Sequence, residues 1–395
     1  MTDGSNGDDN QNHPRGKRER TPSDVSLVTG FPAFTAKRLT RRLLENDARE
    51  KVFLLARNKF RVQVDQFLDE LPPAYKRRVE VLEGDVCDMD LGLGGGEYKT
   101  LAAELTAIHH TAAIYYLGAK REIVERVNVE GTRTTLELAG DCSRLRRFVH
   151  WSTAQVSGSR SGVILEEELD TGQRFRNVYE ESKFRAERMV HEAMRRLPIT
   201  ILRPGVIVGD SKTGEIDKFD GPYYLLVLIV SSPLDVHLPL PGRGSAPLNL
   251  VPIDFVVDAA AALARDPRAA GGTFHLTDPC PFSARTVYEL VAQRADKKPP
   301  RGVIPTGLAR ALLKAPGLER LARAPLAFLE AFNHLAMYNS RHTLALLDGT
   351  GVRCPPFDTY VDHLVRYVRE VQAQKRQRVE DEATDPFDYD SDRQS

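Results

Sequence analysis

Short apolar runs rich in β-branched residues alternate with longer segments of helical periodicity through the first half of the chain. The apolar runs are VSLVT, VFLLAR, VEVLEGDV, AIHHTAA, RFVHWST and ITILRPGVIVG. Continuous apolar strands joined by helical crossovers are typical of a parallel sheet that is covered by helices on both faces. We therefore predict an α/β fold with a doubly wound parallel sheet, in which ligands bind at the carboxyl ends of the strands.

The residue composition of the sequence changes after about Gly209. This change divides the chain into two regions, with a tail at each end. Residues 25–210 carry the strand and helix alternation, and we expect them to form a nucleotide-binding domain with the catalytic residues. Residues 211–372 hold Pro- and Gly-rich loops and are expected to form a smaller substrate-binding cap, interleaved with the last strands. Residues 1–24 and 373–395 are polar or charged, and we expect two disordered tails.

Composition argues against several classes of protein. The 55 Lys and Arg residues balance 55 Asp and Glu residues, so the formal net charge is zero and nothing favours a general nucleic-acid binder. The longest apolar stretch, YYLLVLIV, is far shorter than the roughly 20 residues that span a bilayer, so we expect no integral membrane protein. The first 24 residues lack the apolar core of a secretory signal, and the four cysteines form no CxxC pair. We expect a cytoplasmic protein without disulfides or a metal site.

The first strand leads into a candidate phosphate-binding turn. VSLVTGFPAFTAKRLTRRLL predicts a strand, a tight turn at Thr29 and Gly30, and a helix from near Phe34, whose first amides would face a pyrophosphate. Ala33 and Ala36 stand where a GxxGxxG loop has its second and third glycines. Ala33 is the more serious departure, because its methyl group lies where the backbone would approach the phosphates. A strand, turn and helix that bind nothing is the alternative for this segment alone.

The end of the second strand predicts which nucleotide is preferred. Arg57 stands where dinucleotide folds that select NAD place an Asp or Glu against the ribose 2′-hydroxyl. A guanidinium group can instead hold a 2′-phosphate in bidentate fashion. The residue therefore favours NADP(H), while NAD(H) stays possible, and the alternative is a surface arginine beside a sheet edge.

A tyrosine, a lysine and a hydroxyl group are predicted to meet at the same edge of the sheet. Tyr179 and Lys183 are four residues apart in the helical segment NVYEESKFRAERMV and so share one helix face. An ammonium group beside a phenol lowers its pKa from about 10, which would let Tyr179 exchange a proton with a substrate oxygen. The strand before this helix ends in Ser152 and Thr153. A surface tyrosine and lysine without a catalytic role is the alternative.

In this order, the motifs resemble those of the extended short-chain dehydrogenase/reductase family over residues 25–279. The matching segments are TGFPAFTA at the phosphate turn, GDV, HHTAA, NVEGT, the YxxxK pair and RPGVIVG. The resemblance implies an NAD(P)-binding Rossmann fold. The cofactor-binding residues that it implies, together with those from the phosphate turn, are Thr29, Gly30, Phe31, Ala33, Phe34, Arg57, Asp85, Val86, Thr111, Ala112, Ala113, Lys183, Pro204 and Val206.

The same resemblance implies a role for each catalytic residue. Tyr179 exchanges the proton, and Thr153, in preference to its neighbour Ser152, hydrogen-bonds the carbonyl oxygen. Lys183 lowers the pKa of Tyr179 and holds the nicotinamide ribose, and Asn128 braces the site. The expected reaction is hydride transfer between the nicotinamide and a carbonyl carbon.

Four further segments, STAQVSG, LLAR, GDSKTGEIDKFDGPYY and FHLTDP, are most similar to one branch of that family. This branch contains male-sterility-type fatty acyl-CoA reductases and thioester reductase domains. It implies an aldehyde, ketone or acyl thioester as substrate and a carrier protein or CoA as partner, and it leaves a homodimer open. Two alternatives also stay open: a sugar-nucleotide epimerase or dehydratase that retains NAD, and a catalytically silent nucleotide-binding protein.

Overall fold

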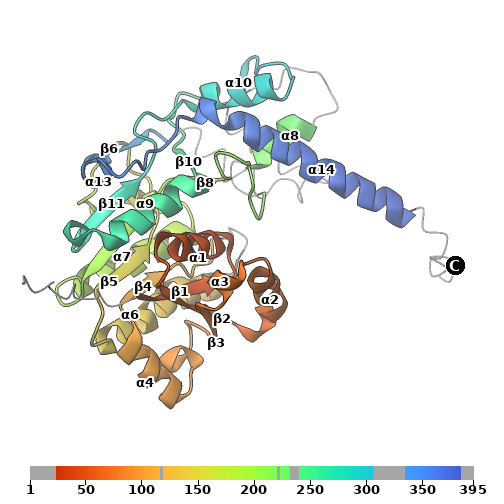
Figure 1. Cartoon of the computed structure of the whole chain (residues 1–395). Helices are drawn as coiled ribbons and strands as arrows, with labels where there is room; N and C mark the ends of the chain where they lie inside the picture. Colours follow the sequence, from red (N-terminus) through yellow and green to blue (C-terminus); the bar gives the residue numbers. More distant parts are fainter. Residues whose placement is uncertain (1–23, 116–118, 220–222, 232–239, 306–333, 384–395) are drawn as a thin grey trace, which may run out of the picture.

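The centre of the molecule is a seven-stranded sheet in the order β11-β7-β5-β4-β1-β2-β3 (Figure 1). The structure, a computed structural model, describes residues 24–115, 119–219, 223–231, 240–305 and 334–383. All neighbouring strands of this sheet run parallel, which confirms the predicted doubly wound α/β fold. The strands are β1 (Val25–Phe31), β2 (Lys51–Ala56), β3 (Val79–Glu83), β4 (Ala107–His110), β5 (Arg147–Trp151), β7 (Ile199–Pro204) and β11 (Gly272–Leu276).

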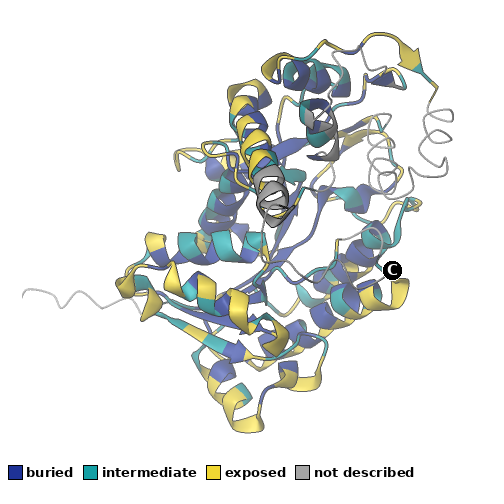
Figure 2. Ribbon diagram, turned by 90° about the vertical axis from the view of Figure 1, so that its right-hand side faces the viewer, coloured by how far each residue is buried: buried dark blue, intermediate teal, exposed yellow. Residues whose placement is uncertain are grey.

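Helices cover both faces of the sheet, and each face has its own apolar core. The helices on one face are α1 (Phe34–Asn46), α2 (Arg61–Asp69) and α9 (Ile253–Arg265), and those on the other are α4 (Gly95–Glu104), α6 (Gly131–Asp141) and α7 (Val178–Ala193). Alternate strand residues feed the two cores, so Val28 packs on the α1 side and Leu27 on the α4 side. Figure 2 shows the strands buried between helices whose outer faces are exposed. Burial on both faces explains why the strands read as continuous apolar runs.

Short helices connect some of these elements. They are α3 (Pro73–Lys76), α5 (Arg121–Glu125), a π-helical turn (Arg126–Glu130) and a 3₁₀ turn (Ala154–Ser157).

The second region has a hydrophobic core of its own, and the chain passes from it back into the main sheet. Its main helices, α8 (Tyr223–Ser231), α10 (Ala284–Arg294) and α14 (Val361–Ala383), pack on one another. The run ITILRPGVIVG divides at Gly205 into β7 and β8 (Val206–Val208), and β8 pairs with β10 (Leu250–Pro252). A Cβ atom at Gly205 would lie 2.7 Å from the Asn249 carbonyl oxygen, so this division requires glycine. The chain then returns to the main sheet as β11.

Two small parallel pairs and one further helix complete this region. The pairs are β9 (Leu240–Pro241) with β12 (Val303–Ile304), and β6 (Gly162–Ile164) with β13 (Ala336–Tyr338), and the helix is α13 (Arg341–Leu347).

The prediction of a disordered tail from residue 373 is wrong over its first part. Helix α14 continues to Ala383. The segment 373–383, AQKRQRVEDEA, contains neither Gly nor Pro and is rich in strong helix formers, so it extends the helix in spite of its charge. The other predicted tail residues, 1–23 and 384–395, lie outside the described residues. Within the described part of the chain, no helix combines the length and the apolar character needed to cross a bilayer.

Candidate active site

The last residues of β1, Thr29 and Gly30 among them, lie against the residues that follow β4. Gly30 has a φ of +79°, and a Cβ atom there would lie 2.7 Å from the Cα atom of Ala112. Both the backbone conformation and the close approach therefore require glycine. The Thr111 hydroxyl donates to the Thr29 carbonyl oxygen at 2.5 Å, and the Ala112 amide donates to the Thr29 hydroxyl at 3.3 Å. Four of the predicted cofactor-binding residues thus lie together at the end of β1.

The N-terminus of α1 is open to an anion. Ala33, at the N-cap position, makes no side-chain cap, and the first turn of α1 holds no acidic residue. Its φ of −58° and ψ of 150° are accessible to any residue, so alanine causes no backbone strain in place of the family's glycine. The first amides of the helix therefore fit a pyrophosphate. The Phe31 ring packs in the core, 5.0 Å from the Phe67 ring between centroids.

Two predicted cofactor-binding residues just past the ends of β2 and β3 form an ion pair. Arg57 Nε lies 3.2 Å from Asp85 Oδ2, and both side chains reach the surface. The other carboxylate oxygen of Asp85 accepts the Cys87 amide at 3.0 Å, which fixes the acid. Arg57 is therefore anchored at the carboxyl edge of the sheet.

Three consecutive residues at the end of β5 each contact one residue on a single face of α7. The pairs are Trp151 with Lys183, Ser152 with Glu187, and Thr153 with Tyr179. Lys183 Nζ donates to the Trp151 carbonyl oxygen at 2.6 Å. The three helix residues are spaced by four, so they lie one turn apart along the face that meets the strand. The structure thus brings the predicted hydroxyl, phenol and amine to one edge of the sheet.

The predicted effect of Lys183 on the phenol of Tyr179 is wrong in this structure. Burial raises the pKa of Tyr179 to about 12, although the hydrogen bond with Thr153 opposes the shift. The Lys183 ammonium is directed at the Trp151 carbonyl oxygen and is not among the groups that shift the pKa of this phenol. Burial lowers the pKa of Lys183 itself to about 8, while Glu187 opposes that change. At neutral pH Tyr179 is therefore a neutral phenol that can donate its proton.

Asn128 links the loop after β4 to α7. It is fully buried in the π-helical turn before α6. Its side-chain oxygen accepts the Ile114 amide at 2.7 Å, and its nitrogen donates to the Ile114 carbonyl oxygen at 3.0 Å and to Ser182 Oγ at 2.9 Å. Ser182 immediately precedes Lys183, so Asn128 holds the helix where the candidate catalytic residues lie.

The adjacent histidines of β4 point to opposite faces of the sheet, as strand alternation predicts. His110 lies 3.0 Å from the hydroxyls of Thr29 and Thr132, whereas His109 lies on the side of Arg265. They therefore do not converge on one metal site. Sequence reasoning missed the structural role of His110, which supports the end of β1 at Thr29.

The remaining predicted residues lie along the same edge. Val86 follows β3, Ala113 follows β4, Phe34 begins α1, and Pro204 and Val206 flank the division between β7 and β8.

Sequence reasoning also missed a buried ion pair behind the site. Arg203 donates to Glu187 Oε1 from Nε at 2.9 Å and from Nη2 at 2.5 Å. A signal was present, because Glu187 follows Lys183 at the same four-residue spacing that separates Tyr179 from Lys183.

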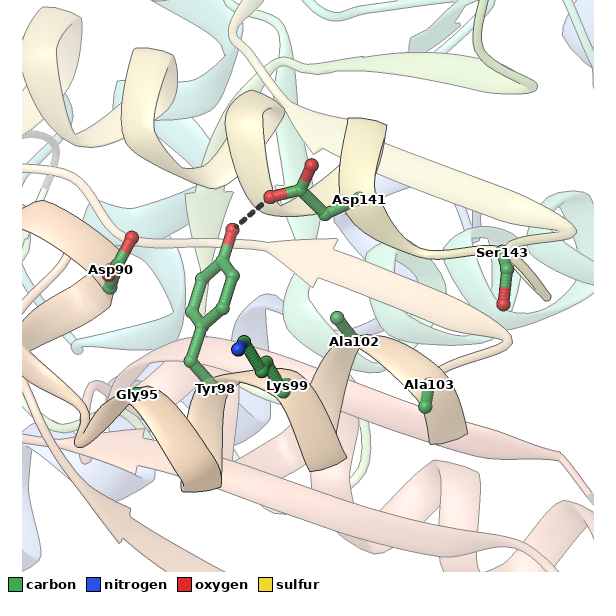
Figure 3. A pocket seen from close by; sticks show the side chains of 8 residues that line it. All are labelled: Asp90, Gly95, Tyr98, Lys99, Ala102, Ala103, Asp141 and Ser143. Carbon is green, nitrogen blue, oxygen red and sulfur yellow. Dashed lines mark hydrogen bonds between the residues drawn. The ribbon is translucent and has the colours of Figure 1, made fainter.

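A surface hollow of about 440 Å³ between α4 and α6 is separate from this site (Figure 3). Tyr98 donates to Asp141 across it at 2.7 Å. None of the candidate catalytic or cofactor-binding residues lines it.

A family comparison identifies the chain. Residues 28–260, more than half of its length, match the family model described as male sterility protein. The chain belongs to the male sterility protein family.

Curated relatives of this family member cover different parts of the chain. The fatty acyl-CoA reductase wat of Drosophila melanogaster is 28% identical over 280 residues, which are 61% of this chain and 54% of the fly protein. A linear gramicidin synthase protein of Brevibacillus parabrevis is 27% identical over 366 residues, which are 85% of this chain and 7% of that protein. The chain thus spans about half or less of the length of these relatives.

Solved structures support the same assignment. The terminal R domain from the myxalamid PKS-NRPS biosynthetic pathway is 27% identical, with a TM-score of 0.76 over 88% of this chain and 91% of that one. A thiolation-reductase di-domain from an archaeal non-ribosomal peptide synthetase shares the fold, with 19% identity and a TM-score of 0.70 over 89% of this chain and 76% of that one. This male sterility protein family member is of the extended short-chain dehydrogenase/reductase type.

Proposed function

We propose that the chain uses NADPH to reduce a carbonyl group and that acyl thioesters, delivered on CoA or on a carrier protein, are its main substrate class. The observation that carries this proposal is the convergence of Thr153, Tyr179 and Lys183 beside the open N-terminus of α1. Support for the thioester comes from a fatty acyl-CoA reductase among the relatives and from the di-domain that joins a reductase to a thiolation domain. Aldehydes and ketones share the reacting carbonyl group and are secondary candidates.

The residues present fit a bound NADPH. The backbone at Gly30 and the uncapped amides of α1 suit the pyrophosphate, because the close approach to Ala112 leaves no room for a side chain. Arg57 pairs with Asp85 through Nε, and the guanidinium group carries further donors on its two Nη atoms that suit a 2′-phosphate. When bound, NADPH supplies the hydride that the carbonyl carbon receives.

The chain's own groups manage the proton and the developing charge. As the carbonyl carbon gains the hydride, the electron pair of the C=O double bond moves to oxygen, and the Tyr179 hydroxyl donates its proton there. With a thioester this gives a hemithioacetal, whose C–S bond then breaks to leave an aldehyde while the hydroxyl proton passes to the departing thiol. The pKa of about 12 keeps Tyr179 loaded with this proton at neutral pH. Thr153 donates a hydrogen bond to the same oxygen. The Lys183 ammonium would hold the nicotinamide ribose. Asn128 keeps α7 in register through Ser182.

The proposal is tested by a fluorescence titration with NADPH and NADH, followed by turnover assays with an acyl-CoA, a phosphopantetheine thioester, an aldehyde and a ketone. We expect micromolar binding that favours NADPH. The variant Tyr179→Phe should lose about 10²- to 10⁴-fold in kcat and keep its affinity for NADPH, because the phenol acts in proton transfer.

Near wild-type turnover by Tyr179→Phe would overturn the mechanism, and failure of both nucleotides to bind at millimolar concentration would overturn the reductase assignment. NAD that stays bound through purification would instead indicate an epimerase or dehydratase. Nucleotide binding without turnover of any of the four substrates would indicate a silent binding protein.

A further inference from the structure

Glu187 is a fully buried acid that lies one turn beyond Lys183 on α7. Its Oε2 atom accepts the Ser152 hydroxyl, and its Oε1 atom accepts two hydrogen bonds from Arg203. Burial alone would raise the pKa of this carboxyl group, but the Arg203 charge and the hydrogen bonds hold it well below its usual range. A buried carboxylate is costly unless its lone pairs are filled, and here they are filled on both sides.

Ser152 gives this acid a direct connection to the catalytic strand. It lies between Trp151, whose carbonyl oxygen accepts Lys183, and Thr153, which hydrogen-bonds Tyr179. Anchoring Ser152 to α7 therefore fixes the residues on both sides of it. The Ser152–Glu187 pair therefore fixes the relative positions of the residues in the other two pairs, Trp151–Lys183 and Thr153–Tyr179.

Arg203 connects the same acid to the second region. It is 1% exposed, and its Nη1 atom donates to the Glu166 carbonyl oxygen at 3.2 Å. The Glu166 carboxylate in turn accepts the His275 amide of β11 at 3.0 Å and the Thr343 hydroxyl of α13 at 2.6 Å. Glu187 thus lies where the catalytic strand, the catalytic helix and the second region meet.

We propose that Glu187 is a positioning residue of this site: it anchors the end of β5 to α7 through Ser152, and its negative charge keeps the buried Lys183 amine protonated. The inference rests on the proposed function, in which a charged Lys183 supports turnover. The inference has a geometric part, the anchoring of β5 to α7, and an electrostatic part, the charge on Lys183. The two parts can be tested separately, because Ser152 takes part only in the anchoring.

The charges around Lys183 explain why one acid has this effect. The groups facing Lys183 and Glu187 are His150 on β5, His110 on β4, Arg203 on β7, His191 on α7 and His275 on β11. Burial lowers the pKa of His110 and His150, so both are neutral near pH 7. Among the groups of the described chain that shift the pKa of Lys183, Glu187 is the one that favours the charged form.

The test measures Lys183 directly, by NMR of the full chain labelled with [¹³Cε]lysine. The Lys183 signal is identified by its loss in Lys183→Arg. The wild-type signal should titrate with a pKa of about 8. In Glu187→Gln the midpoint should fall by about one pH unit or more, whereas Glu187→Asp and Ser152→Ala, which keep the charge, should stay within about 0.3 units of the wild type.

The geometric part has its own readout. Ser152→Ala should lower kcat about tenfold with unchanged NADPH affinity, and Ser152→Thr, which restores the hydroxyl, should recover most of the loss. An unchanged kcat in Ser152→Ala would overturn this part of the inference.

Two outcomes separate the inference from the proposed function. If Lys183 titrates at the wild-type pH in Glu187→Gln, the electrostatic part is wrong. If Lys183 shifts as expected but the alkaline limb of the pH–kcat profile does not move with it, the inference stands and the catalytic role proposed for Lys183 fails.

A second variant covers the case in which Glu187→Gln does not fold because Arg203 loses its partner. Glu187→Gln/Arg203→Met removes both charges together, which buried pairs often tolerate. Its Lys183 midpoint should also fall by about one pH unit, because Arg203 is not among the groups that shift the pKa of Lys183. A midpoint equal to the wild type would overturn the inference.

Discussion

Arg57 and Asp85 form one ion-paired unit, with 3.2 Å between Arg57 Nε and Asp85 Oδ2. The sequence predicts a role in cofactor binding for each residue, with the arginine at the 2′-phosphate. In the structure the acid orients the guanidinium that would hold the phosphate. A partly exposed ion pair contributes only about 0–1 kcal/mol to stability, so its main effect should be on nucleotide binding.

The variant Arg57→Gln should therefore lose its selectivity for NADPH over NADH, with little change in stability. We expect NADPH affinity to fall about tenfold, because a charge-assisted bond to phosphate is lost. NADH affinity should change less than about twofold, since NADH carries no 2′-phosphate. Fluorescence titration with both nucleotides measures the ratio, and an equal loss for the two would contradict the assignment.

The open N-terminus of α1 predicts opposite effects of one substitution on stability and binding. Ala33→Asp would cap the helix and complement its dipole, which should raise the free energy of unfolding by about 1 kcal/mol. The same carboxylate would repel a pyrophosphate, so nucleotide affinity should fall at least about tenfold. Urea unfolding and nucleotide titration of the variant and of the neutral control Ala33→Ser test both effects. Retained affinity in Ala33→Asp would place the phosphates elsewhere.

Replacing Asn128 should reduce stability and kcat more than losing any one of its hydrogen bonds would. Asn128→Ala leaves the Ile114 amide and carbonyl oxygen without their partner and releases Ser182. We expect a loss of about 1–3 kcal/mol in stability and of about tenfold or more in kcat. Ser182→Ala removes the link to α7, together with the Ser182 hydrogen bond to the Tyr179 carbonyl oxygen, and leaves the Ile114 bonds intact, so it is the matched control for the loop contribution. Thermal unfolding and turnover are measured together, and an Asn128→Ala variant with normal kcat would contradict the bracing role.

Three core histidines predict a protein that loses stability in mild acid. Burial lowers the pKa of His109 and His110 to about 3 and that of His150 well below its usual value. Below pH 6.5 the unfolded chain binds protons that the folded chain does not, so the free energy of unfolding falls as the pH drops from about 6.5 toward about 3. At pH 5 each such histidine costs about 2 kcal/mol.

His150→Phe tests this dependence, because neither ring nitrogen of His150 has a hydrogen-bond partner among the described residues and its ring stacks on His110 at 5.7 Å. The variant should lose less stability than the wild type between pH 7 and pH 5 in urea unfolding. Parallel curves for the two proteins would contradict the prediction, because they would show that His150 binds protons equally in the folded and unfolded chains.

The sequence predicts the sheet well because its inner strands, such as β1 and β2, are buried on both faces and read as apolar runs, whereas the edge strand β3, VEVLE, is partly exposed. The connection from the first strand to the first helix was also predicted, but the turn was expected at Thr29 and Gly30, whereas the structure has both residues inside β1 and the turn at Pro32 and Ala33. The division of ITILRPGVIVG at Gly205 was not predicted, since it depends on the Asn249 carbonyl oxygen, which comes from a distant part of the chain.

The electrostatics of the site were harder to predict than its position. A four-residue spacing indicates that Tyr179 and Lys183 share a helix face, but it does not show which acceptor the amine reaches. That acceptor is the Trp151 carbonyl oxygen, which belongs to another element. The role of Glu187 depends in the same way on Arg203, which approaches it only in the folded chain.

The return of the chain to the main sheet as β11 affects how the protein is made. Strand β7 ends at Pro204, and its outer neighbour begins only at Gly272, after the chain has passed through α8, β10 and α9. At roughly 5–20 residues per second on the ribosome, the edge of β7 waits for several seconds without its partner. The unpaired N–H and C=O groups of such an edge strand can form hydrogen bonds with other chains. A fragment that stops at residue 210 would keep this edge permanently open, so residues 25–210 and the region that follows them should fold as one unit and should not be exchangeable as separate modules.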